Sequence, residues 1–143
     1  MELNDLVEIE RIKRLKYRYL RHLDLKQFDQ LALCFAEDAT ASYNDGVWSF
    51  TGRDAIMEFL STHGADRTSL HTAHHPEIEI TGPDTAEATW TLQDIVFRPG
   101  GSQLLGAAHY HDTYVRTDGE WRIKSTGYTR IFERRTTLTG PPS

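Results

Sequence analysis

The sequence predicts an α+β fold in which helices from the first third of the chain pack on one face of a curved, mainly antiparallel sheet. Two observations support this. Apolar residues near the N-terminus recur at helical spacing, and the later segments have the pattern of strands separated by short turn motifs. With 143 residues the chain can bury one sizeable core but not two. We therefore expect a single domain over residues 1–135 and a flexible C-terminal tail over residues 136–143.

Helices are expected mainly before the long strands. The first covers residues 3–23, because its apolar residues follow a helical period. A second, shorter helix covers residues 28–35 and holds Cys34 in its apolar phase. A third begins near Gly52-Arg53-Asp54, where Asp54 is the candidate N-cap. The apolar positions of the first helix are Leu3, Leu6, Val7, Ile9, Ile12, Leu15, Tyr19 and Leu23.

Four long strands follow, and short turns separate them. The motifs Gly82-Pro83-Asp84, Pro99-Gly100-Gly101 and Asp118-Gly119 contain the residue types that tight turns require. Consecutive strands joined in this way form an antiparallel meander. The strands are expected over residues 69–81, 85–98, 103–116 and 121–133.

Composition narrows the classes of partner. The formal net charge of -5 at pH 7 leaves no basic surface for nucleic acid. No apolar run approaches membrane-spanning length, and the charged N-terminus is unlike a signal peptide. The single cysteine, Cys34, cannot form an internal disulfide, and no third metal ligand is spaced near His109 and His111. We expect a cytoplasmic protein that binds a small molecule, without nucleic acid, membrane, metal or cofactor.

Asp94 occupies the most unusual position in the predicted sheet. Between Ala86 and Val96 the even positions are apolar apart from Asp94, and the odd positions from Glu87 to Gln93 are polar. This alternation predicts a half-buried strand with Asp94 on its buried face. A buried carboxylate requires a partner or a shifted pKa, so we expect it to line a polar pocket. Alternatively, Asp94 lies past the buried stretch, beside Arg98 and Gly100-Gly101, and reaches solvent.

Further polar residues would converge where the helices meet the sheet, and they supply an imidazole, carboxylates and phenols. An imidazole is the natural general base at neutral pH, and a carboxylate bonded to its far nitrogen fixes the tautomer and stabilises the imidazolium. Phenols can donate to a carbonyl or to a departing hydroxyl. The candidates are Tyr19, Asp24, Tyr43, His71, His74, His75 and Asp94.

Six short motifs, taken in order, span nearly the whole domain. They are Leu23-Asp24-Leu25-Lys26-Gln27-Phe28, Asp38-Ala39-Thr40, Gly52-Arg53-Asp54-Ala55-Ile56, Asp84-Thr85-Ala86, Tyr110-His111-Asp112-Thr113-Tyr114 and Asp118-Gly119-Glu120-Trp121-Arg122-Ile123. Together they resemble the NTF2-like superfamily, in the SnoaL-like group that includes scytalone dehydratase and bile acid 7α-dehydratase. The resemblance implies a cone-shaped α+β barrel whose helices and curved sheet enclose one deep pocket.

The resemblance also implies roles for single residues. Asp24 matches the catalytic aspartate after the first helix, and Tyr43 matches the pocket tyrosine on the following strand. Tyr19 and Asp94 match a tyrosine and a second acid in the pattern of the bile acid enzyme. Scytalone dehydratase has a histidine near that second-acid position and a tyrosine where this chain has Leu23, so the substrate cannot be taken from either.

The family pattern and strand parity disagree about the histidine. Counting back from Pro76 in the family pattern indicates His71 as the general base. Parity indicates His74, which shares the phase of Ile78 and Ile80. A bulge at Pro76 would shift the phase by one residue. We therefore favour His71 and keep His74 as the alternative.

We predict a cofactor-independent lyase, a dehydratase, that acts on an apolar cyclic compound such as a steroid, polyketide or aromatic molecule. His71 would remove a proton next to a carbonyl while Asp24 orients the imidazole. Tyr19 and Tyr43 would polarise the carbonyl or protonate the departing group, and Asp94 would assist proton transfer or hold a substrate hydroxyl. Isomerisation, cyclisation or dehydrohalogenation would use the same base. The residues expected to bind the substrate are His74, Trp90, Tyr110, Tyr128 and Arg130.

Two interpretations without catalysis stay open. One is an assembly module like the small subunit of a ring-hydroxylating dioxygenase, and the other is a small-molecule binding protein without a working base. Whatever the function, the resemblance implies a homodimer or homotrimer that pairs through the open face of the sheet. The residues expected in that contact are Tyr114, Val115, Ile131 and Phe132.

Overall fold

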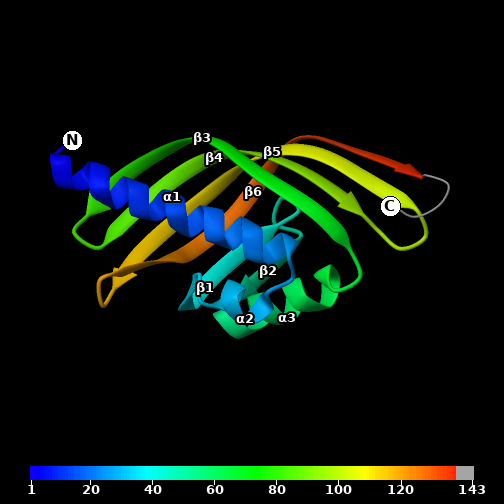
Figure 1. The fold of residues 1–143 in the computed structure, drawn as a ribbon, viewed down its shortest axis with the longest axis horizontal. Helices are drawn as coiled ribbons and strands as arrows, with labels where there is room; N and C mark the ends of the chain where they lie inside the picture. Colours follow the sequence, from blue (N-terminus) through cyan, green and yellow to red (C-terminus); the bar gives the residue numbers. More distant parts are fainter. Residues whose placement is uncertain (138–143) are drawn as a thin grey trace.

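The structure is a computed structural model that describes residues 1–137, and it has the α+β architecture expected from the sequence (Figure 1). The helices are α1 (Leu3–Asp24), α2 (Phe28–Ala32) and α3 (Arg53–Gly64). The strands are β1 (Phe35–Tyr43), β2 (Trp48–Thr51), β3 (Thr68–Gly82), β4 (Thr85–Phe97), β5 (Ser102–Thr117) and β6 (Glu120–Thr137).

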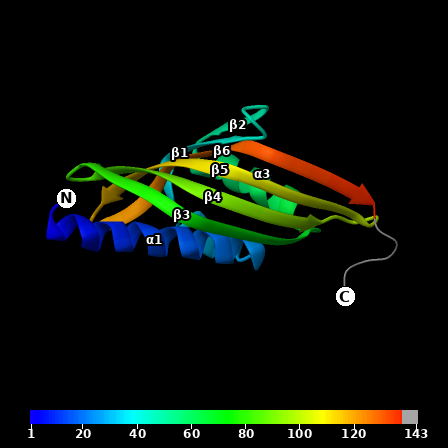
Figure 2. The same cartoon turned by 90° about the horizontal axis from the view of Figure 1, so that it is seen from above.

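The six strands form one curved sheet in the order β2-β1-β6-β5-β4-β3, and the sheet stays open, with β2 and β3 at its edges. Strands β3 to β6 form the expected antiparallel meander. Strand β1 adds to β6 in parallel, which the sequence did not indicate, and β2 folds back antiparallel on β1. Helix α1 runs along one face of the sheet, while α2 and α3 lie beside β1 and β2 (Figures 1 and 2).

Several boundaries differ from those expected. Helix α2 ends at Ala32, so Cys34 is buried in the connection to β1 instead of within a helix. Helix α3 begins one residue before Asp54, because Gly52 serves as N-cap with a φ of 93°, which glycine adopts without strain. Strand β6 continues to Thr137, two residues into the expected tail, and the rest of that tail, residues 138–143, lies outside the described residues.

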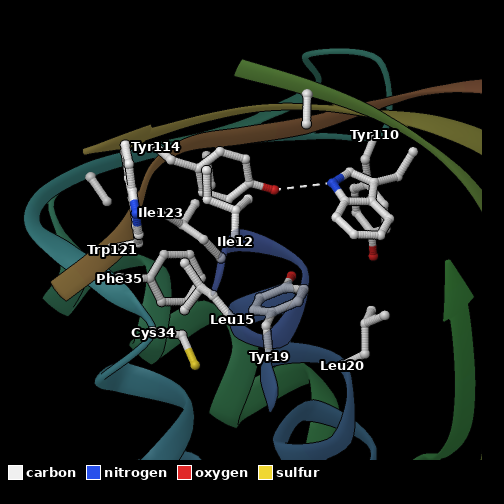
Figure 3. Packing of buried hydrophobic residues seen from close by; sticks show 14 of the residues in the cluster. Ile12, Leu15, Tyr19, Leu20, Cys34, Phe35, Tyr110, Tyr114, Trp121 and Ile123 are labelled. Carbon is white, nitrogen blue, oxygen red and sulfur yellow. Dashed lines mark hydrogen bonds between the residues drawn. The ribbon is translucent and has the colours of Figure 1, made fainter. Parts of the chain in front are cut away.

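The core lies between α1 and the inner face of the sheet (Figure 3). Ile12 and Leu15 of α1 are fully buried there, as the helical period predicts. From β4 and β5 the core receives large aromatic side chains, and the indole of Trp90 donates a hydrogen bond of 3.0 Å to the Tyr114 hydroxyl (Figure 3). None of the helices within residues 1–137 is long and apolar enough to cross a membrane.

A second buried feature is an ion pair inside this core. The Lys16 ammonium lies 2.7 Å from a carboxylate oxygen of Asp112, and both side chains are fully buried. Asp112 also accepts hydrogen bonds from the hydroxyls of Tyr114 and Thr126, at 2.7 and 2.6 Å. Burial lowers the pKa of Lys16 although Asp112 opposes this shift. Because each buried polar atom of Asp112 has a partner, the charge can be retained in the core.

Bulges decide which residues of the long strands face inward. On β3 an extra residue between His74 and Glu77 changes the phase, and His75 there has a φ of 50°. On β6 the register shifts twice, near Lys124 and near Ile131. Each shift exchanges the two faces for the residues that follow. The inward residues of β6 are therefore Trp121 and Ile123, then Thr126, Tyr128 and Arg130, and then Glu133 and Arg135.

The outer face of the sheet exposes several large apolar side chains. Leu70 and Leu105 lie on either side of Ile95 in register, and both are exposed. Ile131 and Phe132 of β6 are exposed as well, and we call Leu70, Leu105, Ile131 and Phe132 the outer-face patch. Tyr114 was expected in such a contact and instead is buried in the core, because β5 turns its even positions inward.

Candidate functional site

A cavity of about 160 Å³ lies between α1, α3 and the inner face of the sheet. An apolar core cavity of similar size holds a benzene-sized ligand, and this one reaches solvent near the exposed Trp48 and Arg135. Much of its wall is apolar, formed by Leu23, Phe59, Leu60, Leu92, Val96 and Leu104. Of the residues predicted for the site, Tyr19, Tyr43, His71, Asp94, Tyr110, Tyr128 and Arg130 line it.

Asp24 and His71 form a hydrogen-bonded pair at this cavity. The Asp24 carboxylate lies 2.7 Å from Nδ1 of His71, and it also accepts the His71 backbone N–H at 2.8 Å and the Ser69 hydroxyl at 2.9 Å. Asp24 is the last residue of α1, and β3 brings His71 to it. With three hydrogen bonds the carboxylate is fixed in place. This contact favours the tautomer of His71 that carries its proton on Nδ1, so Nε2 is free to accept a proton.

Four phenols stand close to the cavity. Tyr19 and Tyr110 come from α1 and β5, and burial raises the pKa of both hydroxyls well above the ordinary value. Burial also raises the pKa of Tyr43. The Tyr43 hydroxyl is buried without a hydrogen-bond partner of good geometry, although the Tyr19 hydroxyl is close enough to influence its pKa. Tyr19, Tyr43 and Tyr110 therefore stay protonated and act as hydrogen-bond donors, and the Tyr43 hydroxyl can donate to a ligand. Tyr128 packs edge-on against the Tyr110 ring.

Asp94 lies on the inner face as the alternation of β4 predicts, and it does not reach bulk solvent. Its two carboxylate oxygens accept bonds from Arg130 at 2.7 and 3.0 Å. Burial alone would lower the pKa of the Arg130 guanidinium, but the hydrogen bonds and charge of Asp94 raise it. The pair lies against Gly106, where a Cβ would collide with both side chains. Glycine is therefore the residue that leaves room for this ion pair.

Two predicted substrate-binding residues lie outside the cavity, which corrects that expectation. His74 precedes the bulge of β3, so it projects from the outer face, is exposed and contacts Thr72 at 3.2 Å. Trp90 is almost completely buried in the core and bonds to Tyr114. The same bulge explains why parity places His74 on the inner face although it lies on the outer one, because Ile78 and Ile80, which set that phase, lie beyond the bulge.

Several residues that line the cavity were missed by sequence reasoning. They are the polar or charged Asn44, His63, Arg67, Ser69, Arg98, Glu133 and Arg135, and the aromatic Phe59. Phe59 stacks on Tyr43, with 5.6 Å between ring centroids. Phe59 lies three residues after Ile56, which is the spacing of one helix face, but nothing local in the sequence shows that α3 closes the cavity beside β1. Within residues 1–137, no three His, Cys, Asp or Glu side chains are placed to hold a metal ion.

The sequence of this chain is similar to those of known proteins. A family model described as a SnoaL-like domain matches residues 4–127. Among curated proteins, "Probable cyclase FGR4" of Gibberella zeae is 22% identical over 134 residues, covering 85% of this chain and 89% of that protein. The uncharacterized protein Rv2910c of Mycobacterium tuberculosis is 26% identical over 136 residues, covering 93% and 90%.

Solved structures show the same fold. A protein of Novosphingobium aromaticivorans named "Putative Scytalone Dehydratase" is 26% identical, with a TM-score of 0.83 over 96% of this chain and 93% of that one. The hexachlorocyclohexane dehydrochlorinase LinA-type3 of Novosphingobium barchaimii is 21% identical, with a TM-score of 0.83 over 99% and 100%. The second likeness concerns the fold alone.

Proposed function

Because the chain belongs to the SnoaL-like family, we propose that it is a cofactor-independent enzyme, and more narrowly a lyase of the dehydratase type that acts on a cyclic small molecule. The observation that carries the proposal is the Asp24–His71 pair at a largely apolar cavity, with contacts of 2.7 and 2.8 Å between the two residues. The solved relative named as a scytalone dehydratase supports elimination of water as the reaction type.

The proposed reaction begins with proton removal. Nε2 of His71 takes a proton from the carbon next to a substrate carbonyl, and the Asp24 carboxylate stabilises the imidazolium that forms. Negative charge then develops on the carbonyl oxygen. Protonated phenols of Tyr19 and Tyr43 donate to that oxygen, and burial strengthens these bonds because little water competes.

Departure of a hydroxyl completes the elimination. The C–O bond breaks, a carbon–carbon double bond forms, and the proton held by His71 leaves with the hydroxyl as water, so that the enzyme returns to its starting state without a co-reactant. Asp94 was expected to transfer a proton or to hold a substrate hydroxyl. Because both of its oxygens are occupied by Arg130, we assign it the positioning of that guanidinium, which can then hold a substrate oxygen.

A cyclase or isomerase is the second candidate, and the curated relative named as a probable cyclase favours it. Both reactions begin with the same proton removal by His71. They differ in the later step, since an isomerase returns the proton to another atom and a cyclase forms a new bond.

The test is proton exchange followed by product analysis. Cyclic β-hydroxy ketones are incubated in deuterated water, and mass spectrometry measures both deuterium uptake next to the carbonyl and loss of water. We expect both with the wild-type protein and neither with His71→Ala, which should keep its fold. Asp24→Asn should lower the rate by about 10²- to 10⁴-fold. His74→Ala is the matched control and should keep full activity. Exchange that persists in His71→Ala would refute the assignment, and exchange without water loss would favour the isomerase.

A further inference from the structure

Three arginines gather at the end of the cavity away from the Asp24–His71 pair. Arg67 follows α3, Arg98 follows β4 and Arg135 lies near the end of β6, and all three line the cavity. We call them the mouth arginines. The proposed reaction uses none of them. Their clustering in a chain of formal net charge -5 therefore requires another explanation.

The acids that line the cavity are already occupied. Within residues 1–137, the cavity lining holds four arginines but two acids, Asp94 and Glu133. Asp94 is bound by Arg130, and Glu133 lies 3.3 Å from Arg130 and 2.8 Å from Arg135. Among residues 1–137, no carboxylate lies within ion-pair distance of Arg67 or Arg98. The cavity therefore has an excess of positive charge at its mouth.

The two uncompensated guanidinium groups are also partly desolvated. Arg67 and Arg98 are each only partly exposed. Burial lowers the pKa of Arg98, and the charges of Arg135 and Arg67 lower it further, while Glu133 and Asp94 offset part of this. Like charges held together in a half-buried position are unfavourable in the empty protein. An anion placed between them would relieve that repulsion.

Strand register gives the spacing between this charge and the reaction centre. His71, Asp94, Gly106 and Glu133 lie in one row across the sheet. The next inward row holds Ser69, Val96, Leu104 and Arg135. Two residues along a strand correspond to roughly 7 Å, so Arg67 and Arg98, which lie four residues from His71 and Asp94 along the chain, are roughly 13 Å from the reaction centre. Since Val96 and Leu104 are apolar, the surface between the two ends suits a flat apolar ring.

We propose that the substrate carries an anionic group, a carboxylate or a phosphate, which Arg67 and Arg98 bind while its ring lies over Val96 and Leu104 and its reactive carbon faces His71. The planar guanidinium fork matches the oxygens of either anion. This inference rests on the proposed function because it uses the same cavity, and it changes the expected substrate from an apolar compound to an amphipathic one.

Binding of probe compounds tests the inference without turnover. The probes are 2-naphthoate, 2-naphthyl phosphate and the neutral 2-naphthamide, titrated by calorimetry at low and high salt. We expect both anions, or one of them, to bind at least about ten-fold more tightly than the amide, which is the ratio that one good charge-assisted contact supplies. The tighter anion identifies whether the group is a carboxylate or a phosphate. Added salt should reduce the preference.

Matched variants locate the effect. The double variant Arg67→Gln/Arg98→Gln should bind anion and amide equally. Arg134→Gln removes the same charge one residue from Arg135, but from an exposed position outside the cavity lining, and it should keep the preference. Equal binding of the three probes by the wild-type protein, or a preference unchanged in the double variant, would overturn the inference. His71→Ala should keep the preference, so a failure of the proposed reaction is distinguishable from a failure of anion binding.

Discussion

Replacing Asp94 by Asn should destabilise the protein, because it removes the carboxylate that binds Arg130 at two nitrogens and leaves that guanidinium with the longer 3.3 Å contact to Glu133. Side-chain exposure is 13% for Arg130 and 6% for Asp94, so the guanidinium has little access to water. Removing one partner of a buried ion pair costs about 3–5 kcal/mol. Because asparagine keeps the shape of the side chain and one acceptor oxygen, we expect the unfolding free energy to fall by the lower end of this range, about 3 kcal/mol. From the alternation of β4 alone, neutralising this carboxylate would have been expected to leave stability unchanged or to raise it.

Urea unfolding followed by circular dichroism measures this loss. The matched control is Asp84→Asn, which breaks a pair with Arg116 at 3.0 Å whose carboxylate side is 63% exposed. That change should cost less than about 1 kcal/mol. The double variant Asp94→Asn/Arg130→Gln should cost clearly less than the two single changes together, because the pair is coupled. An Asp94→Asn variant that unfolds at the wild-type urea concentration would refute this account of the ion pair. Its turnover should also fall by about ten-fold or more, since Arg130 is no longer oriented.

Three further outcomes are expected. Gly106→Ala should cost about 1–3 kcal/mol in urea unfolding, because its Cβ collides with the Asp94–Arg130 pair; wild-type stability would contradict the packing described. The four tyrosines whose pKa burial raises, Tyr19, Tyr43, Tyr110 and Tyr114, contribute stability that is complete below about pH 10 and is lost as the pH rises toward their folded values. Unfolding free energy should thus fall by up to about 5 kcal/mol per pH unit above about pH 10.5. Below that pH the lowered pKa of Lys16 acts in the opposite direction, because Lys16 is easier to deprotonate in the folded protein. An unfolding free energy that stays constant above about pH 10.5 would contradict this. Light scattering should give two or three times the 16.4 kDa chain mass, because the outer-face patch favours association; a monomer at micromolar concentration would count against it.

Local periodicity was sufficient to predict most of the fold. The alternation of β4 corresponds to a strand whose buried residues are those expected. The apolar period of α1 predicts the helix and the burial of Ile12, Leu15 and Tyr19, but the first turns of α1 extend beyond the core, so Leu3, Leu6 and Val7 are exposed. The turn motifs placed the boundaries of β3 to β6 within a few residues. The parallel pairing of β1 with β6 was not predictable in this way, because it joins segments about 85 residues apart and leaves no local pattern.

The candidate site was only partly predictable, because bulges change which face a residue occupies. Counting back two residues at a time from Ile78 places His74 on the inner face. Because β3 contains one extra residue between His74 and Glu77, His71 lies on the inner face instead. On β6 the shift near Ile131 brings both Arg130 and Glu133 to the inner face, although they are three residues apart. A regular strand would have separated them. The mouth of the cavity therefore could not be predicted from alternation, even though each of its residues lies within a predicted element or its flanking turn.

The same alternation marks two inward carboxylates, Asp94 on β4 and Asp112 on β5, and parity alone cannot tell which one belongs to a functional site. Their surroundings can. Asp112 accepts three hydrogen bonds from side chains, including the buried ammonium of Lys16, and it does not line the cavity. Among the residues that the structure describes, Asp94 is bound by Arg130 alone, and both of those side chains line the cavity. An ion pair within the core makes all of its hydrogen bonds to protein groups and cannot bind a ligand. An ion pair at a cavity wall can replace one of these hydrogen bonds by one to a ligand. The position of the partner, and not the burial of the carboxylate, therefore separates the structural acid from the acid at the candidate site.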